Sequence, residues 1–311
     1  MNAFFEKTIG VGHFLFDRRP ANIPSATPKS RATNVWRRDG RVLVARVRAE
    51  GGVKEGVGKA ISLLGSLPQA IRRGDRVMVK PNFNSADPFP ASTDLDFLRA
   101  VIEMLLDAGA TVTVGEGAGG MWRPTDNVFR KVGLHELAKQ LGITLTVFED
   151  KASDWLRIKI DGDYLKTVTM PRSAYEADKL VYVPCMKTHF LAAYSGALKL
   201  AFGFVHPGER RSFHFGDLQH KLAEVNLCWQ PQLTIMDARK AFVSGGPDKG
   251  RLAYPGLILA SGDLVAIDVE AIKVLIEHGA KANLPADPLK LPQIATARKH
   301  GLGVDAYTVV E

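Results

Sequence analysis

The chain has 311 residues, of which 46% are hydrophobic and 24% charged. This composition excludes a disordered chain, a fibrous repeat and a small disulfide-stabilised protein. The longest uncharged stretches, residues 188–198 and 225–236, are shorter than the ~18 apolar residues of a membrane span, so no span is expected. An iron–sulfur cluster normally takes about four thiolates. Because the chain has only Cys185 and Cys228, it is not expected to hold such a cluster alone.

A basic arm precedes the main body of the sequence. The formal net charge is +8, and residues 17–41 concentrate basic side chains, whereas the remainder is close to neutral. This distribution does not favour nucleic-acid binding. Residues 17–30 are rich in Pro and Ser and lack periodicity, so we predict that residues 1–40 form a loosely packed leader on the domain or on a neighbouring subunit. The alternative is an arm that docks on a membrane surface, a protein partner or a second copy.

The apolar run at residues 9–16 does not have the order of a signal peptide. A signal peptide places basic residues before a longer apolar core, whereas Arg18 and Arg19 follow this run. We therefore predict a cytoplasmic protein.

From Arg41 onward, short β-branched runs alternate with amphipathic stretches. This alternation predicts βαβ units, and hence an α/β fold with a mostly parallel twisted sheet flanked by helices. At 155–170 two alternating runs flank Asp161-Gly162, which predicts a small antiparallel hairpin. We expect residues 41–311 to form a single large α/β domain, in one or two lobes. Strands are predicted at 42–47, 76–79, 111–114, 144–148, 180–183, 233–236 and 257–260, and helices at 53–64, 98–109, 128–141, 192–202, 217–228 and 263–278.

Polar side chains follow several of the predicted strands. In open α/β sheets, ligands bind beyond the carboxyl ends of the strands, because loops and helix N-termini gather there. If the strands are parallel neighbours, these side chains share one rim of the sheet. Two of them also have a structural interpretation: Asp263 is placed to cap the following helix, and Asp237 to pair with Arg239 or Lys240. The rim would contain Lys80, Asn82, Glu116, Lys187, His189, Asp237 and Asp263.

A glycine-rich loop follows the strand at 111–114. It matches GxGxxG at Gly115, Gly117 and Gly120. A dinucleotide-binding fingerprint opens directly into a helix, whereas residues 121–124 intervene here before any helical pattern. The loop therefore favours a tight turn or an anion-binding nest around Gly117.

The densest cluster of functional side chains lies between Lys187 and His220. Basic side chains around the small residues 195–197 would hold a phosphate or a carboxylate. Alternatively, His189 with Asp237 or Asp263 would bind a divalent metal, although no metal-binding histidine pair is present. We therefore favour an anionic ligand, and we expect His220 and Glu224 to form a solvated pair. The cluster contains His189, His206, His214, His220, Lys187, Lys199, Arg210 and Arg211.

Five short motifs, in this order, resemble the domain-of-unknown-function family 362. They are Lys80-Pro-Asn82, Lys187-Thr-His189, Gly196-Ala-Leu-Lys199, Phe202-Gly203 and Asp263-Leu-Val-Ala-Ile-Asp268. The resemblance runs from about Arg41 to His278 and implies a site built from Lys80, Asn82, Lys187, His189, Lys199 and Asp263. Many members of that family carry a ferredoxin-like cluster domain, but this chain lacks the cysteines. It also has Lys199-Leu-Ala where members often have Lys-Asn-Leu.

Two functions are consistent with these residues. The first is an enzyme acting on a small anionic metabolite, in which Lys187, Lys80 and Arg210 neutralise the anion and His189 is a general base or a metal ligand. Asn82, Lys199 and Gly117 would complete the ligand-binding site. The cofactor is unknown, with a divalent metal as the candidate. The alternative is a non-catalytic metal- or ligand-binding accessory or maturation protein that works with a partner.

Overall fold

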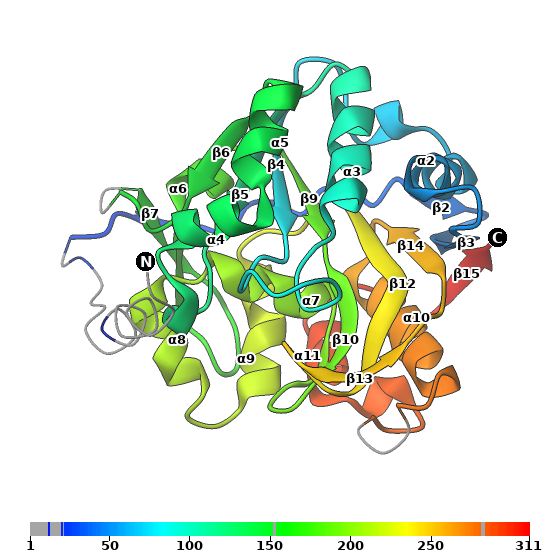
Figure 1. Cartoon of the computed structure of the whole chain (residues 1–311). Coiled ribbons are helices and arrows are strands. Elements are labelled where there is room, and N and C mark those ends of the chain that lie inside the picture. The colour runs from blue at the N-terminus through cyan, green and yellow to red at the C-terminus, as the bar shows by residue number, and fades with distance from the viewer. Residues whose placement is uncertain (1–11, 13–19, 21, 152–153, 281–283) are drawn as a thin grey trace.

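A large, mostly parallel sheet organises the chain (Figure 1). The computed structural model describes residues 12, 20, 22–151, 154–280 and 284–311. The sheet's main path runs β15-β3-β14-β12-β9-β4-β5-β6, and only the pairings of β14 with β12 and β3 are antiparallel. Its strands are β3 (Arg41–Arg48), β4 (Arg76–Pro81), β5 (Thr111–Glu116), β6 (Thr144–Val147), β9 (Lys179–Val183), β12 (Leu233–Gly245), β14 (Leu257–Ser261) and β15 (Tyr307–Val310), with β2 (Arg37–Arg38), β10 (Cys185–His189), β11 (Ala193–Ser195) and β13 (Gly250–Ala253) paired outside the path.

Helices cover both faces of this sheet, because alternate side chains of each central strand are apolar and point to opposite faces. In β4, Val77 and Val79 belong to one apolar cluster, whereas Met78 belongs to the cluster on the other face. The molecule therefore has three layers (Figure 1). One face is covered by α2 (Val53–Leu64), α3 (Leu95–Asp107), α4 (Thr125–Val132) and α5 (Leu134–Leu141), and the other by α7 (Ala197–Leu200), α8 (Pro207–Phe213), α9 (Leu218–Glu224), α10 (Leu264–Glu277) and α11 (Pro292–Lys299).

The predicted α/β architecture, strands and hairpin are confirmed. The hairpin consists of β7 (Trp155–Lys159) and β8 (Thr167–Pro171), which pair antiparallel. It does not join the edge of the main sheet, however. It forms a separate small sheet with β1 (Ser25–Ala26), and α6 (Arg172–Tyr175) follows it.

Three predicted helices differ from those observed. The helix predicted at 128–141 is two helices, α4 and α5. Gly133 between them has φ 81°, a left-handed conformation that ends α4. The prediction of one helix at 192–202 is wrong. Residues 193–195 instead form β11, which returns antiparallel along β10, and the helical part begins only at Ala197 as α7, followed by a 3-10 turn at Ala201–Phe204. The helix at 217–228 ends at Glu224 and continues as the 3-10 turn Val225–Leu227.

The described part of the basic arm is more closely packed than the sequence suggested. Trp36 is fully buried, and its Nε1 donates to the carbonyl of Gln232 over 2.9 Å. The ammonium of Lys29 donates to the carbonyl of Ala177 over 2.5 Å and lies over the ring of Trp229. Aromatic and cationic contacts therefore hold residues 22–40 on the domain. The predictions for residues 1–11, 13–19 and 21 lie outside the described residues.

In the part of the chain that the structure describes, no helix has both the length and the apolar character required to cross a bilayer.

Candidate functional site

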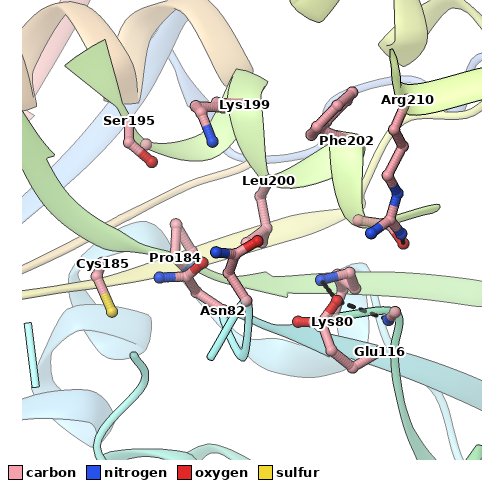
Figure 2. A pocket seen from close by; sticks show the side chains of 14 residues that line it. Lys80, Asn82, Glu116, Pro184, Cys185, Ser195, Lys199, Leu200, Phe202 and Arg210 are labelled. Carbon is pink, nitrogen blue, oxygen red and sulfur yellow. Dashed lines mark hydrogen bonds and ion pairs between the residues drawn. The ribbon is translucent and has the colours of Figure 1, made fainter. Parts of the chain in front are cut away.

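Two adjoining cavities lie beyond the carboxyl ends of β4, β5 and β9, and Figure 2 shows the residues that line the smaller one. The larger has a volume of about 300 Å³ and the smaller about 30 Å³. The larger also contains Lys187 and His189, and the smaller Lys80, Glu116 and Gly117. In Figure 2, Lys199 and Arg210 approach from one side, and Lys80, Asn82 and Glu116 from the other. Both cavities are lined by Asn82, Asn84, Ser195, Lys199, Phe202 and Arg210.

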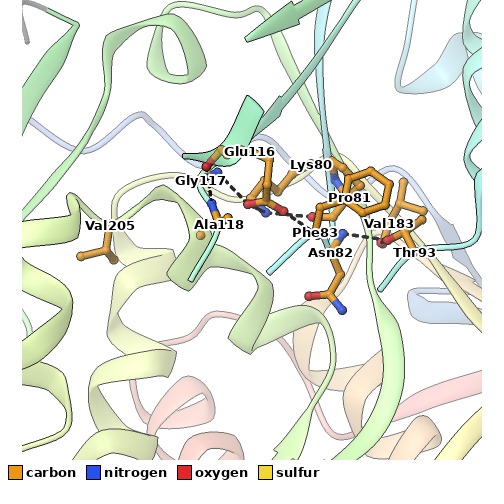
Figure 3. Close-up of polar contacts among 12 residues, drawn as sticks. Lys80, Pro81, Asn82, Phe83, Thr93, Glu116, Gly117, Ala118, Val183 and Val205 are labelled. Carbon is orange, nitrogen blue, oxygen red and sulfur yellow. Dashed lines mark hydrogen bonds and ion pairs between the residues drawn. The ribbon is translucent and has the colours of Figure 1, made fainter. Parts of the chain in front are cut away.

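Lys80 and Glu116 form an ion pair in the floor of the smaller cavity (Figure 3). The Nζ of Lys80 lies 2.5 Å from Oε1 of Glu116, and both side chains are buried. The carboxylate also accepts from the backbone N–H groups of Phe83 and Gly117, each over 2.8 Å. Burial lowers the pKa of Lys80, and the carboxylate of Glu116 opposes this shift. The sequence predicted that Lys80 neutralises a bound anion. In the structure Glu116 neutralises Lys80 instead, and the pair forms the floor of the smaller cavity.

Lys187 and Arg210 are buried cations that donate to carbonyl groups. The ammonium of Lys187, on β10, donates to the carbonyls of Pro90 and Ala91. Burial lowers the pKa of Lys187 to about 8, and the carboxylates of Asp248 and Asp87 oppose this shift. The guanidinium of Arg210, on α8, donates to the carbonyls of Ala118, Val205 and Gly203 over 2.6, 2.8 and 2.8 Å. No carboxylate among the described residues forms an ion pair with either side chain, although Glu149 and Glu116 lie near enough to Arg210 to balance part of its charge.

Lys199 lies on the short helix α7, which a buried carboxylate holds in place. Asp268 on α10 accepts from the backbone N–H groups of Ala197 and Leu198 over 2.7 and 2.9 Å and from the hydroxyl of Tyr194 over 2.8 Å. Asp268 is therefore an internal partner of α7 and does not line either cavity. Burial raises the pKa of Asp268 to about 6. The carboxylate caps α7 and so fixes where Lys199 enters the cavity.

The ammonium of Lys199 shares an aromatic neighbour with Arg210. Its Nζ lies 5.9 Å from the ring centroid of Phe202, and the guanidinium of Arg210 lies 5.7 Å from the same centroid. Burial, together with the nearby cations Lys187, Lys80 and Arg210, lowers the pKa of Lys199 to about 7, and the carboxylate of Glu116 opposes the shift. Cations therefore outnumber carboxylates around Lys199.

The tautomer of His189 is fixed by the backbone. Its Nδ1 accepts from the N–H groups of Leu191 and Ala192 over 3.1 and 3.2 Å, so the proton lies on Nε2. Burial lowers the pKa of His189 to about 2, with Lys199 and Lys187 contributing, so the imidazole is neutral. A general base or a metal ligand needs a free ring lone pair. With these two backbone bonds in place His189 offers an Nε2–H donor, and either predicted role would require the bonds at Nδ1 to break or Nε2 to lose its proton.

The predicted metal set of His189, Asp237 and Asp263 is not brought together. Asp237 is buried and bonded to the guanidinium of Arg239, as its structural interpretation predicted. Asp263 caps α10 through the N–H groups of Val265 and Ala266. It lies at the opposite end of the sheet, because β14 runs antiparallel to β12. The shared rim therefore excludes Asp263.

The metal-ligating groups that do converge, within the described ranges, lie elsewhere. Asp163, Glu224 and His300 have ligand atoms within 4.8 Å of one another. Glu224 is fully buried and accepts from the backbone N–H groups of residues 163–165, and Asp163 pairs with Lys299. The solvated His220–Glu224 pair was therefore a wrong prediction, since Glu224 caps a loop and His220 instead bonds to Thr296.

The remaining residues that the sequence singled out are Gly117, His206, His214 and Asn82, and most of them have structural roles. A Cβ at Gly117 would lie 2.7 Å from Nη2 of Arg210, so only glycine allows this approach. The loop leads into the 3-10 turn Gly120–Trp122, and the first α-helix after it, α4, begins only at Thr125. His206 caps α8, whereas His214 lines the larger cavity. The amide of Asn82 donates to the carbonyl of Ala91 over 3.0 Å.

Sequence reasoning missed the roles of several residues of the site. Arg123 and Phe202 line the larger cavity, and Glu116 neutralises Lys80. The sequence placed Glu116 on the rim but did not pair it with Lys80. Phe202 was marked only by the Phe202-Gly203 motif, and no local pattern marked Arg123.

The chain is thus an α/β protein with a cavity lined by lysine and arginine side chains at the carboxyl ends of parallel strands. The chain belongs to the family described as "Domain of unknown function (DUF362)", whose model matches residues 77–273. A thylakoid-associated protein of Synechocystis sp. (strain ATCC 27184 / PCC 6803 / Kazusa) is 26% identical over 256 residues, covering 78% of this chain and 73% of that protein. The lactate racemase apoprotein from Thermoanaerobacterium thermosaccharolyticum is 16% identical with a TM-score of 0.37. That similarity covers 71% of this chain but only 56% of the racemase.

Proposed function

We propose that this protein is an enzyme that binds a small anionic metabolite, with a carboxylate or phosphate group, in the larger cavity. One observation carries the proposal: Lys187, Lys199 and Arg210 line a cavity of about 300 Å³, and no described carboxylate forms an ion pair with them. Buried charges without counterions are costly to the fold. A bound anion would supply the missing counterion.

Neutral hydrogen-bond donors accompany these cations. The Nε2–H of His189 and the hydroxyl of Ser195 belong to residues that line the same cavity. Arginine and lysine bind carboxylate and phosphate through charge-assisted hydrogen bonds, and neutral donors add to them. A cavity of this volume suits a metabolite rather than a polymer.

A non-catalytic binding protein is the second candidate, and the mouth of the cavity supports it. Phe190, Leu191 and Met121 line the larger cavity and are 71%, 50% and 50% exposed. Exposed apolar side chains around a site favour a partner surface. The Synechocystis relative, described as thylakoid-associated, is consistent with such an association.

A thermal-shift screen separates these functions. Wild-type protein would be heated with a panel of phosphates and small carboxylates, beside Lys187→Met and the control Lys54→Met, which alters an exposed lysine on α2. We expect a subset of anions to raise the melting temperature of the wild type and of Lys54→Met but not of Lys187→Met. Stabilising compounds would then be followed by NMR. Conversion supports the enzyme, unchanged compounds support the binding protein, and no stabilisation by any anion contradicts both.

A further inference from the structure

Lys199 differs from the other cations of the site because its amine has no polar partner among the described residues. Lys80 is paired with Glu116, Lys187 donates to two carbonyls, and Arg210 donates to three. The Nζ of Lys199, by contrast, makes no hydrogen bond or ion pair with any described residue. It lies over the ring of Phe202, and Lys199 lines both cavities. The amine is therefore free to react with a molecule in the cavity.

The surroundings of Lys199 make this amine a nucleophile near neutral pH. Burial and the neighbouring cations lower its pKa to about 7, so roughly half of the amine is unprotonated at that pH. An exposed lysine is almost wholly protonated under the same conditions. Desolvation beside another cation is a known way to activate a lysine toward carbonyl compounds.

A structural role does not account for this placement. A lysine that stabilises a fold normally pairs with a carboxylate or donates to carbonyls, as Lys80 and Lys187 do here. Lys199, which is half-buried, has neither kind of partner among the described residues. Asp268 on α10 moreover holds α7, and with it Lys199, through two backbone N–H groups. A fixed, unpaired amine at a cavity is better explained by chemistry than by stability.

We infer that Lys199 forms an imine with the carbonyl carbon of a small anion that carries an aldehyde or ketone beside its carboxylate. This inference rests on the proposed function, because Lys187 and Arg210 would hold the carboxylate. The lone pair of Nζ attacks the carbonyl carbon, and a proton passes from nitrogen to oxygen to give a carbinolamine. Loss of the hydroxyl as water then leaves the C=N bond. Amine and carbonyl become imine and water, with no oxidant or reductant.

Reductive trapping tests this inference on the full chain. The protein would be incubated with pyruvate and sodium cyanoborohydride between pH 6 and 9, and the modified lysines located by peptide mass spectrometry. We expect an adduct at Lys199 that forms on the order of 10-fold or more faster than at the exposed Lys54. Its rate should rise with pH around pH 7. Lys199→Arg keeps a cation but should lose this adduct.

Oxalate separates failure of the imine from failure of the anion site, because it is a small dicarboxylate without a ketone or aldehyde. Its binding to the same sample would be measured by calorimetry. If oxalate binds and pyruvate leaves Lys199 unmodified, the imine is wrong and the anion site stands. If adducts form equally on exposed lysines, the inference is also overturned. If neither compound binds or reacts, the proposed site and the imine fail together.

Discussion

Lys80 and Glu116 lie at the ends of adjacent parallel strands and form a buried ion pair with an Nζ–Oε1 distance of 2.5 Å. This pair neutralises a cation that would otherwise face the cavity. The pair also leaves no room for a side chain at position 203, since a Cβ on Gly203 would lie 2.6 Å from Nζ of Lys80. The positive charge available to a ligand therefore belongs to Lys187, Lys199 and Arg210.

The ion pair predicts a large stability difference between two glutamates. Glu116→Gln leaves the buried Lys80 without its counterion and should lower the free energy of unfolding by about 3 kcal/mol. The control Glu103→Gln breaks the pair with Lys54, whose side chain is 75% exposed, and should cost less than about 1 kcal/mol. Urea unfolding measures both. Equal costs would show that Glu116 does not compensate a buried charge.

Lys199 should destabilise the free protein in a pH-dependent way. Its folded pKa is about 7 and its reference value 10.5, so between these values the unfolded chain holds a proton that the folded chain has lost. Stability contributed by this group therefore rises as the pH rises from 7 to 10. Lys199→Met should be more stable than the wild type at pH 6, by about 1 to 3 kcal/mol, and equally stable near pH 10. A difference that is independent of pH would contradict this electrostatic account.

Asp268 should affect ligand binding from a distance, because it caps the helix that carries Lys199. Asp268→Ala leaves the N–H groups of Ala197 and Leu198 unpaired in a buried setting and should cost about 2 to 4 kcal/mol of stability. Anion affinity should fall by about 10-fold as α7 loosens. The control is Asp96→Ala, at an exposed position of α3. Unchanged affinity in Asp268→Ala would show that α7 is held by other contacts.

His189 should not titrate in the physiological range. With Nδ1 bonded to two backbone N–H groups and a pKa of about 2, the ring stays in the neutral Nε2–H form. Nitrogen-15 NMR of the ring should show constant shifts from pH 5 to pH 8. A ring that titrates near pH 6.5 would restore the general-base role that the sequence suggested.

The divalent metal stays a prediction, and elemental analysis of purified protein tests it.

The features of the fold that were predictable from the sequence are those that depend on residues close together in the chain. Asp263 was expected to cap a helix, and it does, because a cap depends on residues within one helical turn. The direction of β14 was not predictable, because a short apolar run has no polarity of its own in the sequence. That single reversal moved Asp263 to the opposite end of the sheet.

The same distinction holds for the site. Lys187 and Arg210 were assigned to the anion site from the cluster of basic side chains between residues 187 and 220, and the structure gathers both around one cavity. The state of His189 depends on N–H groups placed by the turn after β10, and the charge of Lys80 depends on the pairing of β4 with β5. Such tertiary contacts leave no pattern in a single sequence.

Calorimetric titration with oxalate and phosphate most directly tests the central claim, that Lys187, Lys199 and Arg210 form an anion site. We expect one saturable site in the wild type and in Lys54→Met, and at least about 10-fold weaker binding in Lys187→Met. Because Lys199 and Lys187 lose protons near pH 7 and 8 in the free protein, affinity should fall from pH 6 to pH 9 and binding should take up protons. Absence of saturable binding, or equal affinity in Lys187→Met, would contradict the account.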